Sequence, residues 1–209
     1  CDLVVKTARR VSGLPERLMG STALHLVRKS PVPVLVVQPK RRIHFNRILV
    51  PLDFRGDSPA EDSLNASIMD TALSMAASGD IELHFVHAWQ PYGASLLASG
   101  RVRMPAEEVM EYVNSHRERQ KQRFEEFLHR SSLDHVRHRA HFVRGEAATI
   151  IPELASRHRI SLIVMGSTYS SGLGGIFMGG TAEQVLSAVT CSILSLKPEG
   201  FQTPVDTAL

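Results

Sequence analysis

The sequence predicts an α/β protein with a doubly wound, five-stranded parallel sheet and helices on both faces, plus the tail of a second domain of the same type. Two observations support this fold class. Short apolar runs alternate along the chain with longer segments of helical periodicity, which is the pattern of a parallel sheet with crossover helices. The chain also repeats part of itself at a distance of about one domain.

The internal repeat aligns residues 3–37 with residues 162–196 without a gap, so residue 3 matches residue 162 at an offset of 159. Within it, Thr22-Ala23 matches Thr181-Ala182, and both copies end in a short apolar run. An offset of this size corresponds to a whole domain and not to a solenoid repeat. The chain has no initiator Met and no first half for the earlier copy, so we expect a fragment of a longer protein.

This repeat divides the chain into three segments. We expect residues 1–39 (copy one) to be the C-terminal strand–loop–helix–strand unit of a first domain. Residues 40–199 (copy two) are expected to form a complete domain, reached through the polar and basic stretch Gln38 to Arg42. Residues 200–209 show no periodicity and are expected to lie over the surface as a tail.

Five apolar runs in copy two predict its strands. The first, Arg47 to Asp53, is almost continuously apolar, as a strand that is buried on both faces requires. The predicted strands are residues 47–53, 81–87, 136–143, 162–165 and 191–196.

Helical spacing and terminal signals predict four helices between these strands. The first begins at Asp57-Ser58-Pro59, which supplies an N-cap and a Pro at the first helical position, and it ends at Gly79. Pro152 lies inside the third predicted helix and is expected to shorten or bend it. The predicted helices are residues 57–79, 106–130, 147–158 and 179–188.

The fold class itself predicts where a ligand would bind. Ligands of doubly wound sheets lie outside the carboxyl ends of the strands, where the strand order reverses. Asp53 follows the first predicted strand and Gly166 follows the fourth. Both residues are therefore predicted to border a ligand site.

Motifs at these positions resemble those of the universal stress protein family. Val164-Met165-Gly166-Ser167 followed by Gly179-Gly180-Thr181-Ala182-Glu183 resembles the family signature, which in ATP-holding members is a Gly, two residues, a second Gly, nine residues and then Gly-Ser or Gly-Thr. Val50 to Asp53 resembles the first strand of the family, whose Asp contacts the nucleoside. Leu83 to His87 resembles the second strand, which supplies an apolar contact to adenine.

The resemblance covers nearly the whole chain and implies the adenine nucleotide hydrolase-like fold of this family. The run Lys197 to Val205 and residues 150–155 are also similar to members that have tandem domains. By resemblance, the cofactor-binding residues of copy two are Pro51, Leu52, Asp53, Phe85, Met165, Gly166, Ser167, Tyr169, Gly179, Gly180 and Thr181.

Copy two departs from the ATP-binding signature at two positions. Tyr169 stands at the second glycine position, where its ring would fill the space of the phosphates, and Gly180 replaces the Ser or Thr. We therefore expect a stress-response binding protein in which ATP binding is weakened or lost and no cofactor is required. The alternative is an ATP-binding member that acts as a nucleotide-dependent switch, with at most slow ATP hydrolysis.

A purely structural interpretation of the same residues stays open. Asp53 could cap the following turn, Phe85 could be a core residue, and Gly166 could fit a tight junction between strand and loop. In copy one, Thr7 and Arg10 replace the two glycines, so no nucleotide is expected there.

Enzymatic chemistry is not predicted. Related ATP-using enzymes of the pyrophosphatase type carry a Ser-Gly-Gly loop directly after the first strand, whereas this chain reads Asp53-Phe54-Arg55-Gly56-Asp57. The chain also lacks a Walker sequence, a Gly-x-Ser-x-Gly elbow and a His-Glu-x-x-His motif. We therefore expect no catalytic residues and a binding function.

A metal site is not predicted either. Alternation along one strand separates His138 from His141, and likewise His84 from His87, so neither pair converges on one face. The two cysteines are too few for a disulfide framework or a cysteine-based metal site, and they fit a reducing cytoplasm.

The expected partners are other copies of the same fold and a small molecule. A formal charge of +3 is only mildly basic and no nucleic-acid motif or long apolar run is present, so neither nucleic acid nor a membrane is expected. The closing runs Val34 to Val37 and Ile193 to Leu196 are apolar edges that invite pairing, within or between chains. The apolar stretch Tyr92 to Gly100 could form a lid or wall for a small ligand, or pack as an ordinary loop.

Overall fold

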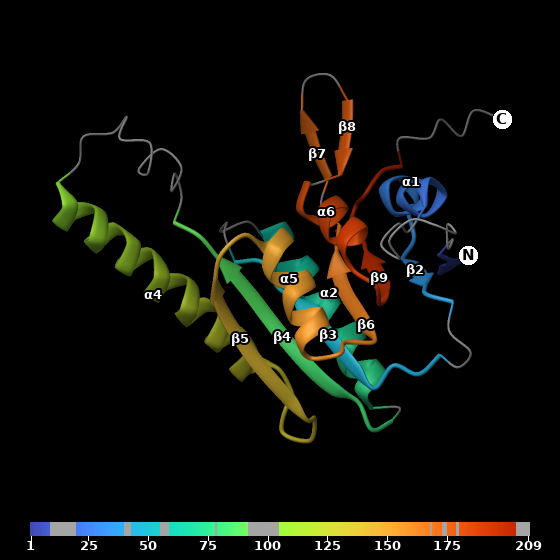
Figure 1. Ribbon diagram of the computed structural model, residues 1–209, viewed down its shortest axis with the longest axis horizontal. Helices are drawn as coiled ribbons and strands as arrows, with labels where there is room; N and C mark the ends of the chain where they lie inside the picture. Colours follow the sequence, from blue (N-terminus) through green and yellow to red (C-terminus); the bar gives the residue numbers. More distant parts are fainter. Residues whose placement is uncertain are drawn as a thin grey trace.

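One mixed sheet organises the chain in the computed structural model, which describes residues 1–8, 20–39, 43–54, 59–77, 79–91, 105–167, 169–172, 175–178 and 180–203 (Figure 1). Its strands are β1 (Val4–Thr7), β2 (Val34–Val37), β3 (Arg47–Pro51), β4 (Glu82–Trp89), β5 (His138–Arg144), β6 (Leu162–Gly166) and β9 (Ser192–Leu196). The helices are α1 (Ser21–Lys29), α2 (Pro59–Ala76), α4 (Ala106–Arg130), α5 (Ala147–Arg157) and α6 (Gly180–Ala188). A separate hairpin consists of β7 (Tyr169–Gly172) and β8 (Gly175–Met178).

The sheet has seven strands in the order β1-β2-β9-β6-β3-β4-β5, so the five-stranded sheet predicted from the sequence is wrong. The difference arises because β1 and β2 of copy one join the sheet of copy two through the pairing of β2 with β9. Within the described residues, copy one does not form a second domain of its own. The α/β class, the parallel pairing of the copy-two strands and the helices on both faces are as predicted.

The two copies meet where β2 runs antiparallel to β9. Leu35 lies opposite Leu194, with Val34 opposite Ser195 and Val36 opposite Ile193. Leu194 follows Leu35 by 159 residues, the offset of the repeat, so these two equivalent residues face each other and the two flanking pairs are related by exchange of the copies. This junction, called the seam below, therefore has two-fold symmetry in its register. Pairing of this kind between separate chains stays a prediction.

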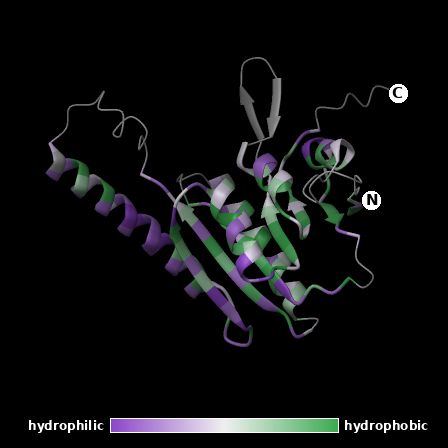
Figure 2. Cartoon of the chain, in the orientation of Figure 1, coloured by the Kyte–Doolittle hydropathy of each residue, from purple (hydrophilic) through white to green (hydrophobic). Residues whose placement is uncertain are grey.

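Apolar layers cover both faces of the sheet (Figures 1 and 2). On one face, α1, α5 and α6 pack against the strands through residues such as Val27, Ile151 and Val185. On the other face, α2 and α4 contribute Ile68 and Phe124. Figure 2 shows hydrophobic residues concentrated on the central strands and a largely hydrophilic α4. None of the described helices combines the length and the apolar character that a membrane span requires.

α1 of copy one is fastened to the C-terminal part of copy two. Lys197, which directly follows β9, donates from Nζ to the carbonyl oxygen of Val27 at 2.6 Å. Arg28 forms an ion pair with Glu183 of α6. Burial lowers the pKa of Lys197 to about 8, as expected for an amine packed between two elements. These contacts add to the seam in holding copy one against copy two.

The longer predicted elements match the structure closely. The helix predicted over residues 106–130 is α4 (Ala106–Arg130), whereas α5 continues beyond Pro152 to Arg157 and is not cut short. The segment after β6, predicted as a loop, contains the hairpin of β7 and β8. The predicted N-cap at Asp57-Ser58 and the apolar stretch Tyr92 to Gly100 lie outside the described residues.

Replacement of Val36 by Ala tests the packing of the seam. Val36 is fully buried, so removing two methyl groups should lower the free energy of unfolding by about 2 kcal/mol. Val5→Ala on neighbouring β1, at a side chain 59% exposed, is the matched control and should change it by less than about 0.5 kcal/mol. Urea unfolding followed by circular dichroism measures both values. Equal losses in the two variants would show that copy one is not packed against copy two.

Candidate ligand-binding cavity

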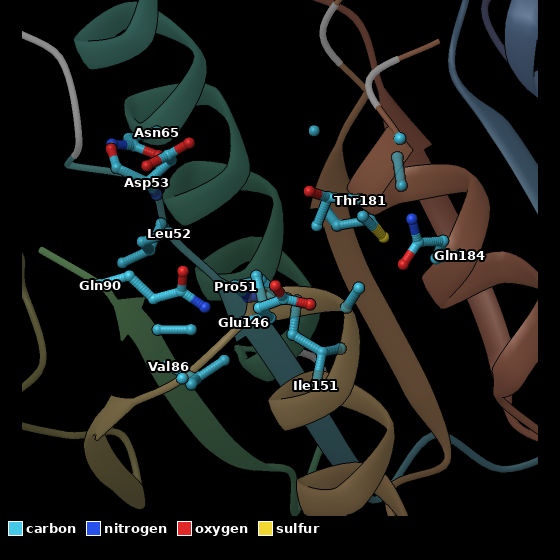
Figure 3. Close-up of a pocket in the computed structure, with 18 of the residues that line it drawn as sticks. Pro51, Leu52, Asp53, Asn65, Val86, Gln90, Glu146, Ile151, Thr181 and Gln184 are labelled. Carbon is cyan, nitrogen blue, oxygen red and sulfur yellow. Dashed lines mark hydrogen bonds between the residues drawn. The ribbon is translucent and has the colours of Figure 1, made fainter. Parts of the chain in front are cut away.

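A cavity of about 590 Å³ opens at the carboxyl ends of β3, β4 and β6 (Figure 3). This is the edge at which a doubly wound sheet places its ligand, and the volume is within the range of small-molecule sites. Helices α5 and α6 begin at its wall with Ala147 and Gly180. The cavity is therefore bordered by three strand ends and by two helix N-termini.

Seven of the residues predicted for cofactor binding line this cavity. They are Pro51, Leu52, Asp53, Met165, Gly166, Gly180 and Thr181. They come from three segments that lie far apart in the sequence, and the strand ends bring them together. Gly179 lies outside the described residues, and Tyr169 is described only through its backbone, which begins β7 opposite Met178.

Phe85 does not belong to the cavity, contrary to the prediction. Its side chain is fully buried in the layer between the sheet and helices α2 and α4. Because side chains alternate along a strand, its neighbour Val86 points to the opposite face and lines the cavity, as does Ala88. Phe85 therefore has the core position that the purely structural interpretation of the sequence allows.

Ser167 also lies outside the cavity and bonds back into the sheet. Its backbone N–H donates to the carbonyl oxygen of Leu196 at 2.9 Å, and its hydroxyl oxygen accepts from Ser195 Oγ at 3.0 Å. The side chain is buried. Ser167 therefore joins the ends of β6 and β9 and has a structural role in this fold.

Asn65 of α2, which the motifs did not single out, fixes the backbone at Asp53. Its Nδ2 donates to the carbonyl oxygen of Asp53 at 2.6 Å, and its Oδ1 accepts from the Asp53 N–H at 3.2 Å. Asn65 is buried and lines the cavity. A polar residue on the buried face of a helix, between Leu64 and Ile68, is the sequence signal that could have identified it.

Gly166 fits closely against α2. A Cβ at this position would lie 2.6 Å from Leu64 Cδ2 and 3.2 Å from Ile68 Cδ1. The missing side chain at Gly166 thus has a packing reason that is independent of any ligand. Gly180 has no such constraint, because the nearest atom to a Cβ there is Gln184 Nε2 at 3.8 Å.

The charged side chains in the described part of the cavity wall are carboxylates. Asp53 follows β3 and Glu146 precedes α5, and the described lining residues include no Lys, Arg or His (Figure 3). Helix N-termini attract anions through their free N–H groups, but Glu146 occupies the N-cap position of α5. An anion would therefore be accommodated best at the N-terminus of α6, near Gly180 and Thr181.

The model of the universal stress protein family matches residues 1–38 and 44–197 of this chain. The chain belongs to this family. The two matched segments nearly coincide with copy one and copy two as the repeat defines them.

Curated relatives of this universal stress protein include two that bear the name universal stress protein E. The protein from Salmonella typhi is 27% identical over 206 residues, which cover 98% of this chain and 64% of the relative. The one from Escherichia coli K12 is 25% identical, covering 98% of this chain and 63% of the relative. The chain thus spans a little under two thirds of the length of these relatives.

A solved structure supports the fold. The crystal structure of a functionally unknown protein from Pseudomonas aeruginosa PAO1 is similar with a TM-score of 0.71 and 25% sequence identity. The similarity covers 95% of this chain and 63% of the other. The seam and the cavity both lie within a fold of known type.

Replacement of Gly166 by Ala separates packing from ligand binding. The new Cβ would clash with Leu64, so we expect the free energy of unfolding to fall by about 1–3 kcal/mol without any ligand. Gly180→Ala is the matched control at the same cavity, and it should be neutral or stabilising by up to about 1 kcal/mol. Urea unfolding measures both changes. Unchanged stability in Gly166→Ala would argue that this glycine serves a ligand and not the packing of α2.

Proposed function

We propose that this universal stress protein is a cytoplasmic stress-response binding protein of the E type, whose cavity holds a small molecule and whose affinity for ATP is weakened or lost. The proposed role is binding and not catalysis. The charge of the cavity wall supports it most directly, since two carboxylates and no cationic side chain are found among the described lining residues. Sites that hold phosphoryl groups usually supply Lys, Arg or a metal ion to balance their charge.

The surroundings of Gly166 are consistent with this proposal. In a phosphate-binding loop, a glycine lets backbone amides approach the phosphate oxygens. Here the position is filled by contact with Leu64 of α2, so the glycine does not by itself indicate a phosphate loop.

A second candidate function is that of an ATP-dependent switch. It is favoured by the convergence of seven predicted residues on one cavity, among them Asp53 and Thr181. Two hydrogen bonds between its backbone and the side chain of Asn65 also hold Asp53 in place, as a binding residue would be. The N-terminus of α6 offers the nucleotide a place for its phosphates.

Nucleotide titration decides between the two functions. Native mass spectrometry of the freshly purified chain should show no bound ATP. Calorimetry should give a Kd for MgATP above about 0.1 mM, which corresponds to a binding free energy weaker than about −5.5 kcal/mol. Adenosine, which lacks the phosphates, is titrated in parallel and should bind at least as well as MgATP. A micromolar Kd for MgATP that Asp53→Ala abolishes would instead establish the switch.

Neutralising Glu146 tests the electrostatic reason for weak ATP binding. Removal of a carboxylate from the N-terminus of α5 should strengthen MgATP binding about threefold to tenfold in Glu146→Gln and leave adenosine binding unchanged. Glu153→Gln, on the exposed side of the same helix, is the matched control and should alter neither affinity. If Glu146→Gln binds MgATP no better than the control does, the charge of the wall is not what weakens ATP binding.

A further inference from the structure

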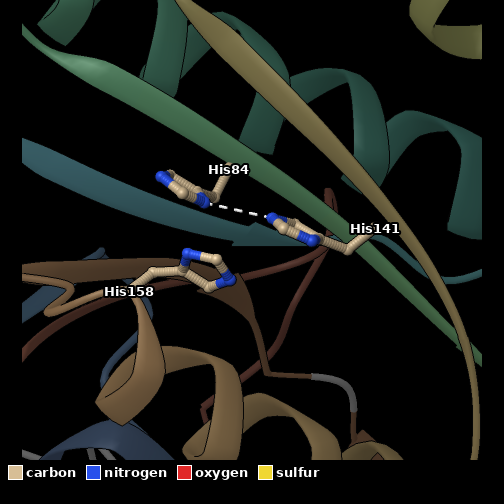
Figure 4. A group of neighbouring side chains, drawn as sticks. All are labelled: His84, His141 and His158. Atoms are coloured by element: carbon tan, nitrogen blue, oxygen red, sulfur yellow. Dashed lines mark hydrogen bonds between the residues drawn. The ribbon is translucent and has the colours of Figure 1, made fainter.

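Three histidines from three different elements gather at the C-terminal end of α5 (Figure 4). His84 belongs to β4, His141 belongs to β5, and His158 follows the last residue of α5. One ring nitrogen of each lies within 4.8 Å of the others. The cavity described above lies at the opposite end of α5, so this histidine cluster is a separate feature of the fold.

The spacing of the ring nitrogens is close to that of metal ligands. His84 Nδ1 and His141 Nε2 are 3.0 Å apart. Two nitrogens bound to one tetrahedral zinc ion at 2.0–2.1 Å are separated by about 3.3 Å. Completing a three-histidine site then requires His158 to move by up to about 1.5 Å, which a partly exposed side chain at a helix end can do.

Packing alone leaves one atom of the cluster unexplained. His84 is 1% exposed, and its Nε2 has no hydrogen-bond partner in the part of the chain that the structure describes. This nitrogen faces Glu82 Oε1 at 3.7 Å. A histidine that binds a metal through one nitrogen commonly directs the N–H of the other toward a carboxylate, which fixes the ring. Ligation through Nδ1 would give His84 this arrangement with Glu82.

The neighbouring charges are arranged around the carboxylate of Glu82. Glu82 accepts from Arg139 Nε at 2.7 Å and pairs with Arg47 Nε at 3.3 Å, so one carboxylate pairs with both guanidinium groups. Arg47 also donates to the carbonyl oxygen of His158 at 3.3 Å, which ties the end of α5 to β3. The C-terminus of a helix carries partial negative charge and favours a cation beside it.

We propose that His84, His141 and His158 form a binding site for a divalent transition-metal ion, and that zinc is the ion that occupies it. Imidazole ligands suit zinc, and three of them leave a fourth tetrahedral position for water or another small ligand. Prediction from the sequence missed this site because it considered each strand by itself, whereas the cluster combines two strands and a helix end. The proposal does not depend on what the cavity binds.

Zinc titration of the full chain tests the proposal. Competition with a chromophoric chelator at neutral pH should show one tight Zn²⁺ site per chain, and Co²⁺ should give the visible absorption of a tetrahedral complex. His141→Gln and His158→Gln, at half-buried positions that tolerate the change better than His84, should weaken Zn²⁺ binding at least about 100-fold. His138→Gln, an exposed neighbour on β5, is the matched control and should bind as the unaltered chain does.

A conservative variant and the thermal stability keep the result interpretable. His158→Cys retains a zinc ligand and should restore binding and raise Tm on addition of Zn²⁺, which a purely structural role would not predict. Absence of a tight site in the unaltered chain would overturn the proposal. So would equal zinc affinity in His138→Gln, His141→Gln and His158→Gln, because the ion would then be held by histidines elsewhere on the surface.

Discussion

The pairing of β2 with β9 is the contact on which the rest of the fold depends. Without β2, β9 would be an edge strand with an apolar sequence, and such edges invite unwanted pairing. With it, β9 lies between β2 and β6 and all five of its residues are buried. α1 then packs beside α5 and α6 over one continuous apolar layer, and Lys197 binds α1 to the strand that it covers. Copy one thus completes the core of copy two and does not merely precede it.

The position of the cavity could be predicted from the sequence because the carboxyl ends of parallel strands meet at one edge whatever the loops do. Asp53 and Gly166 follow from that rule. The direction of the Phe85 side chain could not be predicted in this way. A family motif identifies a strand, whereas the alternation of side chains along that strand decides which residue reaches the cavity. Asn65 and Glu146 lie outside the motifs and enter the site only through the packing of their helices. The apolar runs Val34 to Val37 and Ile193 to Leu196 indicated that these segments pair, but not that β1 and β2 extend the sheet of copy two to seven strands.

α5 links two sites of opposite electrostatic character. Its N-terminus, where backbone N–H groups attract anions, lies at the cavity and is countered there by Glu146. Its C-terminus, where carbonyl groups favour cations, lies at the histidine cluster with His158. Between these ends, Ile151 and Leu154 anchor the helix in the apolar layer on the sheet. One helix, packed on the sheet by its apolar side, therefore fixes the positions of both sites and favours a different charge at each.

The symmetry of the seam has a consequence for how the two copies can diverge. The backbone bond from Ser167 to the end of β9 recurs between Ala8 and the end of β2, at 2.9 and 2.8 Å, so the same local geometry occurs twice. Side chains do not follow this symmetry: Ser195 and Ser167 share a hydroxyl hydrogen bond, whereas their equivalents Val36 and Ala8 are apolar core residues. In a symmetric homodimer, one mutation alters both sides of the two-fold axis at once. When the two copies are joined in a single polypeptide, each copy can accept substitutions on its side of the axis that the other copy would not tolerate.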